Sequence, residues 1–253
     1  TNYTDDSPGA NDNASGMAGT IEAARVLSEY TFNNSILYVG LAGEEQGLFG
    51  GKGLDYFKSI AVDSLKGYVL AGGTRSFDNG DSQGWLLSVN RDGFPKWEKT
   101  YGDKGEDAFN NITRTKDNCF VAVGSSASFF SRGMKDVVMI KLDSLGQKLW
   151  MNLYGGKEDD IANAVSESKD GGFIITGETT SYGKGKSDIL LLKTNQLGTE
   201  KWKKTVGGIG VDIGNSVKEL AKGGYIISGT STISNLSFDS ILIKTDKKGN
   251  VSK

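Results

Sequence analysis

The 253-residue sequence contains no histidine, one cysteine, two prolines and no long apolar run. Without histidine it lacks both the commonest zinc ligand and the commonest general base. The lone Cys119 excludes an internal disulfide, so packing and hydrogen bonds must hold the fold together. No segment approaches the roughly 20 apolar residues that span a bilayer, and the first residues do not follow a signal-peptide pattern. We therefore expect no membrane span.

The chain also carries little net charge. A formal charge of −2 gives no basic face for phosphate neutralisation, so we expect no nucleic-acid partner. Thirty-six glycines, with 24% charged and 37% hydrophobic residues, are typical of a globular chain that turns often.

The character of the sequence changes near residue 50. Residues 1–49 contain seven acidic residues and one basic residue, and the rest of the chain contains 24 acidic and 28 basic residues. Apolar side chains recur at helical spacing from Met17 to Leu27, and the apolar segment 35–42 favours a buried strand. We therefore predict a small α/β fragment over 1–49 and a separate domain over 50–253.

Residues 50–253 show a step of about 52 residues. Trp97, Trp150 and Trp202 are 53 and 52 residues apart. The same step links Phe120, Phe173 and Tyr225; Gly72, Gly124, Gly177 and Gly229; Asp55, Asp107, Asp160 and Asp212; and Lys141, Lys193 and Lys244. The pattern predicts four tandem units, over about 50–101, 102–154, 155–206 and 207–253.

Each unit is expected to be a four-stranded antiparallel blade. In the third unit, turn residues separate strands predicted at about 162–168, 173–180, 188–194 and 200–206. Four strands in about 52 residues indicate a mainly all-β fold, a β-propeller. The fourth unit reaches Lys253 where a tryptophan is expected, so we predict that its last strand is missing and that the propeller is open or incomplete.

We call each set of like residues that recurs at the 52-residue step a ladder. Two of these ladders allow alternative interpretations. The four aspartates could hold a cation, but aspartate commonly fixes a turn by accepting backbone N–H bonds, and we favour that role. The tryptophans could stack on sugars, but one per blade in a fixed register favours packing between blades. A sugar-active propeller would need a carboxylate pair, and the sequence identifies none.

The pattern [Asp/Asn]-x-x-Gly-x-x-x-Trp occurs at Asn90–Trp97, Asp143–Trp150 and Asn195–Trp202. It resembles motifs of blade-forming repeats in secreted and surface bacterial proteins. That resemblance implies a secreted or cell-surface location and specifies architecture more than activity. We expect a peptide or protein ligand on the propeller.

The first 49 residues carry a second motif set. Ser7 to Gly16 reads SPGANDNASG, a helix and a strand are predicted to follow, and Glu44 to Leu48 reads EEQGL. This order is similar to the zinc aminopeptidase family M28. The resemblance implies that Asp12 bridges two zinc ions, Glu44 acts as general base and Glu45 is a zinc ligand.

The chain departs from that family at the remaining ligands. The family has two histidine ligands, and a further aspartate at a position where this chain has Gly72. A zinc site ordinarily needs at least three protein ligands. We therefore expect zinc from the resemblance but no binding by this chain alone. The first hypothesis is a binding or scaffold propeller joined to an incomplete peptidase segment. The alternative is a zinc-dependent aminopeptidase whose missing ligands lie outside this chain.

Overall fold

The computed structural model describes residues 49–63, 67–77, 81–128, 134–234 and 237–251. The chain divides into two units, Thr1–Gly51 and Lys52–Lys253. The α/β fragment predicted for residues 1–49 lies, but for Phe49, outside the described residues. The described part of the chain is all β and contains no helix, which confirms the mainly all-β prediction for residues 50–253.

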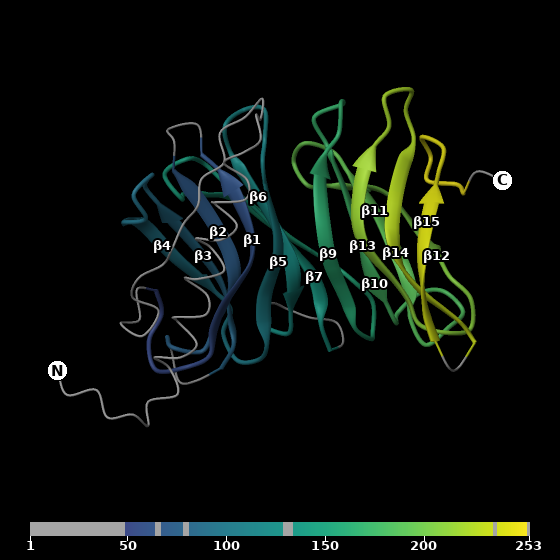
Figure 1. Ribbon diagram of the computed structural model, residues 1–253, viewed down its shortest axis with the longest axis horizontal. Helices are drawn as coiled ribbons and strands as arrows, with labels where there is room; N and C mark the ends of the chain where they lie inside the picture. Colours follow the sequence, from purple (N-terminus) through teal and green to yellow (C-terminus); the bar gives the residue numbers. More distant parts are fainter. Residues whose placement is uncertain (1–48, 64–66, 78–80, 129–133, 235–236, 252–253) are drawn as a thin grey trace, which may run out of the picture. The chain divides into compact units, whose positions relative to one another are not determined.

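In the described residues, fifteen strands form four antiparallel sheets, each built from strands that are consecutive along the chain (Figure 1). The first sheet contains β1 (Asp55–Val62), β2 (Tyr68–Thr74), β3 (Gln83–Val89) and β4 (Pro95–Tyr101). The second contains β5 (Asp107–Arg114), β6 (Phe120–Ser126), β7 (Asp136–Leu142) and β8 (Lys148–Tyr154). The third contains β9 (Asp160–Glu167), β10 (Phe173–Thr179), β11 (Asp188–Thr194) and β12 (Glu200–Val206). The fourth contains β13 (Asp212–Glu219), β14 (Tyr225–Ser234) and β15 (Ser237–Lys244).

Each sheet packs against the next one along the chain. Three apolar clusters fill these boundaries, centred on Leu86 and Phe120, on Met139 and Ile175, and on Leu191 and Ile227. Three interfaces joining four sheets do not close a ring, so the described residues form an open propeller. The fourth sheet has three strands, as predicted from the missing tryptophan. Leu242 of β15 is 71% exposed, whereas Leu191 at the same register of β11 is fully buried under the fourth sheet.

The first strand of every sheet bulges at the same place. One residue is skipped in the pairing of each first strand with the second: Lys58, Asn110, Asn163 and Asn215. The bulge pushes a carbonyl oxygen toward the glycine on the second strand. A Cβ atom on Gly177 would lie 1.9 Å from the Ile161 oxygen, and Gly72, Gly124 and Gly229 are equally crowded. The glycine ladder therefore exists because the bulge leaves no room for a side chain.

The turn motif forms one structure four times. In each copy the first side chain accepts two backbone N–H bonds, as Asn195 does from Leu197 and Thr199 at 2.9 Å each. Asn90, Asp143 and Asp246 do the same. The glycine of the motif has a positive φ, 77° at Gly198, which the missing side chain permits.

The tryptophans occupy like positions between the sheets. Trp97, Trp150 and Trp202 are partly buried and pack on the first, second and third apolar clusters. Each ring lies against the turn glycine of the following sheet, Gly146, Gly198 and Gly249 respectively. This confirms the interpretation that they form part of the packing between blades.

Candidate functional site

The residues assigned by the peptidase resemblance are Asp12, Glu44 and Glu45. All three lie outside the described residues, so their predicted roles stay predictions. Within the described part of the chain, no group of three or more histidine, cysteine, aspartate or glutamate side chains is placed to hold a metal ion.

The aspartate ladder occupies the first residue of the first strand in each sheet. Asp160 accepts hydrogen bonds from the Gly156 N–H at 2.8 Å and from the Ser181 hydroxyl at 2.6 Å. Asp212 accepts one from the Gly208 N–H at 2.8 Å. Asp55 and Asp107 accept hydroxyl hydrogen bonds instead. These contacts support the role of fixing the segments between sheets.

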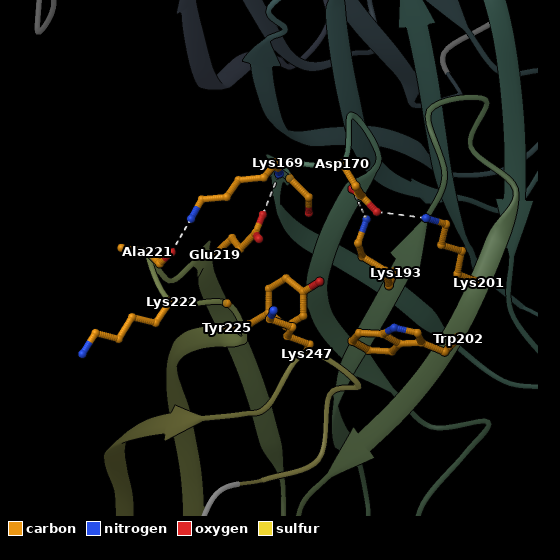
Figure 2. A pocket seen from close by; sticks show the side chains of 12 residues that line it. Lys169, Asp170, Lys193, Lys201, Trp202, Glu219, Ala221, Lys222, Tyr225 and Lys247 are labelled. Atoms are coloured by element: carbon orange, nitrogen blue, oxygen red, sulfur yellow. Dashed lines mark hydrogen bonds and ion pairs between the residues drawn. The ribbon is translucent and has the colours of Figure 1, made fainter.

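A pocket of about 490 Å³ lies at the boundary of the third and fourth sheets (Figure 2). Its lining combines two aromatic rings, Trp202 and Tyr225, with two carboxylates, Asp170 and Glu219. The rest of the polar lining consists of Ser168 and five lysines, Lys169, Lys193, Lys201, Lys222 and Lys247. They come from two hairpin turns, from β11 and β12, and from the turn after β15, so the packing of the two sheets creates the pocket.

Asp170 lies between two of these lysines. Its two carboxylate oxygens accept bonds of 2.9 Å from Lys193 and from Lys201. Burial would raise the pKa of Asp170, but the bonds from both lysines outweigh it and hold this pKa well below its usual range. The side chain of Lys193 is only 5% exposed, and burial lowers its pKa despite the carboxylate. Asp170 is therefore an ionised carboxylate whose charge is balanced by two lysines, and its role is structural.

The second carboxylate of the pocket, that of Glu219, also has a hydrogen-bond partner. Glu219 accepts a 2.7 Å bond from the backbone N–H of Lys169. The Lys169 ammonium in turn donates to the carbonyl oxygens of Leu220 and Ala221, at 3.3 and 2.5 Å. Lys222 and Lys247 take part in no ion pair or side-chain hydrogen bond within the described residues. The pocket therefore has a surplus of positive charge.

The aromatic side chains form the base of the pocket. Trp202 and Tyr225 meet edge to face, with ring centroids 5.8 Å apart. Burial, together with Glu219 and Asp170, raises the pKa of Tyr225 to about 12, so its hydroxyl stays protonated at neutral pH. In Figure 2 this hydroxyl points toward the side of the pocket where Lys193 lies. The hydroxyl can therefore act as a hydrogen-bond donor.

The preceding sheet boundary shows which parts of the pocket are framework. There Lys116 N–H bonds Glu167 at 2.9 Å and Lys141 pairs with Asp117 at 2.6 Å, as Lys169 and Lys193 do one step later. Six pocket residues differ from their counterparts at that boundary. Lys201 stands in place of Leu149, Lys222 of Asp170, Lys247 of Gln196, Tyr225 of Phe173, Ala221 of Lys169 and Ser168 of Thr115. These differences distinguish the pocket, and sequence reasoning passed over all of them except Tyr225, which it counted in the aromatic ladder.

The model of peptidase family M28 matches residues 2–116. This range includes Asp12, Glu44 and Glu45 and continues through β1–β4 into the second sheet. A protein named probable zinc metalloprotease from Leptosphaeria maculans is 34% identical over 98 residues, which are 38% of this chain and 23% of that protein. Another of that name from Pyrenophora teres is 53% identical over 49 residues, 19% of this chain and 10% of that protein. The matched segments thus span between about a tenth and a quarter of these relatives.

Among solved structures, a protein of unknown function from Dyadobacter fermentans superposes with a TM-score of 0.51 at 15% identity. The match covers 80% of this chain and 70% of that one. No helix long and apolar enough to cross a membrane occurs in the described part of the chain. The chain thus combines a resemblance to peptidase family M28 in its N-terminal part with an open, propeller-like fold over its four sheets.

Proposed function

We propose that residues 50–253 act as a binding scaffold, joined to an M28-like segment that is not catalytically competent by itself. The absence of histidine from all 253 residues carries the second half of this proposal. The first half is supported by the four sheets, which hold their turns in fixed register by recurring contacts. The ligand is a peptide or a protein, and the blade motif supports a secreted or cell-surface location.

The donor set in the sequence does not fit a pair of zinc ions. Of the ligands that the family resemblance assigns, this chain supplies Asp12 and Glu45, with Glu44 as the base. Catalytic zinc sites ordinarily use three protein ligands per metal and leave a position for water. Two carboxylates cannot supply such a set for one ion, still less for two. No hydrolytic step is therefore assigned to this chain alone.

The alternative is a zinc-dependent aminopeptidase whose remaining ligands come from outside these 253 residues. The family match over residues 2–116 favours it, as do relatives named probable zinc metalloproteases. In that case Glu44 would deprotonate a metal-activated water, and Asp12 and Glu45 would be part of a larger ligand set.

Hydrolysis of an aminoacyl anilide by the purified chain, with stoichiometric zinc, tests the proposal. We expect no turnover that depends on Glu44, measured as the difference between the chain and its Glu44→Gln variant. Glu158→Gln, an exposed glutamate of the third sheet region, is the matched control. Tightly bound zinc with turnover abolished by Glu44→Gln alone would establish the aminopeptidase alternative.

A further inference from the structure

We propose that the pocket between the third and fourth sheets binds an acidic peptide segment. This inference rests on the proposed scaffold function and gives it a ligand class and a place. It depends on the charge surplus of the pocket, on the arrangement of its lysines and on its aromatic base.

The charge surplus is available to a ligand because both carboxylates of the pocket already have partners. Asp170 is held by Lys193 and Lys201, and Glu219 by the backbone of Lys169. Lys222 and Lys247 have no such partner among the described residues. A carboxylate that reaches the ammonium group of Lys247 or of Lys222 therefore does so without breaking an existing ion pair.

The arrangement of the cations favours several spaced carboxylates over one small oxyanion. The side chain of Lys222 points away from the other lysines, and that of Lys169 turns toward Ala221 (Figure 2). The lysines thus do not converge on a single point. None of the described residues that line the pocket is an arginine, so they do not provide the planar fork that binds one phosphate or carboxylate through two parallel bonds.

The size and base of the pocket suit a peptide. About 490 Å³ lies within the range of roughly 300–1,000 Å³ that holds small ligands or a few residues. The partly buried Trp202 offers apolar ring surface to the aliphatic part of a glutamate side chain, and the hydroxyl of Tyr225, a residue that is 5% exposed, can donate to a carboxylate at the base of the pocket. Polar and apolar contacts are then made by the same short segment.

Binding of fluorescein-labelled hexaglutamate to the full chain, measured by anisotropy, tests this proposal. Hexaglutamine, inorganic phosphate and a heparin hexasaccharide serve as competitors. The variant Lys222→Gln/Lys247→Gln removes the two unpaired cations, and Lys157→Gln/Lys184→Gln removes two exposed lysines elsewhere in the third sheet. Tyr225→Phe restores the aromatic residue of the preceding boundary, and thermal unfolding checks that each variant is folded.

We expect the pocket double variant to bind hexaglutamate at least about tenfold more weakly than the chain, and the control variant to bind within about twofold. Tyr225→Phe should weaken binding by about threefold or more. Hexaglutamine should not compete, and the affinity should fall as salt rises.

Four outcomes would overturn the proposal. Equal affinity of both double variants would place the acidic ligand elsewhere on the propeller, which removes the pocket assignment but leaves the scaffold function standing. Competition by phosphate at the concentration of the peptide would make this a small-oxyanion site, and preference for heparin would make it a polysaccharide site. Absence of any hexaglutamate binding would also remove the pocket assignment, while the zinc assay separately decides the proposed function.

Discussion

The side-chain amide of Asn163 donates a 3.1 Å hydrogen bond to the carbonyl oxygen of Gly214, across the boundary between the third and fourth sheets. Asn163 is the bulged residue of β9, and the bulge aims its side chain at the next sheet. One boundary earlier, the bulged Asn110 donates to Ala162 at 2.9 Å. The bulge thus couples the sheets as well as shaping each one.

Replacing Asn163 by alanine should lower the free energy of unfolding by about 1–2 kcal/mol, because the Gly214 carbonyl loses its partner. Asn215 is the matched control. It occupies the same bulge in β13, but it is exposed and has no hydrogen-bond partner among the described residues. Asn215→Ala should change stability by less than about 0.5 kcal/mol. Urea unfolding measures both, and equal losses would show that the bond contributes nothing.

Gly177→Ala should be among the most damaging substitutions in the protein. Its Cβ would lie 1.9 Å from the Ile161 carbonyl oxygen, and the bulged backbone cannot retreat without losing its pairing. We expect a loss of at least about 3 kcal/mol. Gly208→Ala, where nothing lies within 4 Å of the new Cβ, should be nearly neutral. A mild effect at Gly177 would mean that the bulge is readily remodelled.

The sequence predicted the fold through ladders whose physical causes only the structure reveals. In the third sheet, β10, β11 and β12 agree with their predicted ranges to within one residue, and β9 begins two residues earlier than predicted. Turn residues such as Gly198 mark the ends of the strands in the sequence, because few residue types other than glycine adopt a positive φ. The bulge was not predicted, because an unpaired residue such as Asn163 has no distinct hydrophobic pattern. The repeated glycine on the second strand was the one sequence feature that the bulge produced.

The site was less predictable than the fold. The ladders drew attention to residues that recur, and these proved to be framework. Lys222 and Lys247 were overlooked because they break the 52-residue pattern, and Tyr225 was noted only as the third member of the aromatic ladder. The proximity of these three residues depends on two sheets packing together. The sequence signal that could have identified these pocket residues is their difference from the residues at the same position in the other units. The peptidase motif was recognised from Asp12, Glu44 and Glu45, which lie outside the described residues.

Stability should depend on Asp117 in acid. Burial raises the pKa of this carboxyl, but hydrogen bonds from Lys141 and Thr115 outweigh burial and lower it from an ordinary 3.8 to about 2. A lowered pKa in the folded state means that the contribution is complete above about pH 4 and is lost as pH falls toward about 2. The Asp117 side chain is 57% exposed, so solvent screening limits the effect.

Asp117→Asn should therefore cost about 1 kcal/mol at neutral pH, mainly because the nearly buried Lys141 loses its counter-charge. The difference from the unsubstituted protein should shrink on acidification and vanish once the pH falls below the folded pKa of about 2. Denaturant unfolding along this pH series measures it. Exposed Asp92→Asn is the control, and a difference that stays constant with pH would contradict the assignment to charge.

The same substitution should activate Cys119, the protein's single cysteine. Burial raises the pKa of its thiol, and the charge of Asp117 raises it further, whereas Lys141 lowers it. Asp117→Asn removes the larger of two unfavourable charges, since Asp143 also raises this pKa, and leaves the favourable charge of Lys141. The thiolate fraction near pH 8 should therefore grow, and iodoacetamide should react several-fold faster. Looser packing would also accelerate labelling, but it would raise the rate at every pH. We expect instead a pH–rate profile with a lower midpoint and an unchanged plateau, and an unmoved midpoint would refute the electrostatic explanation.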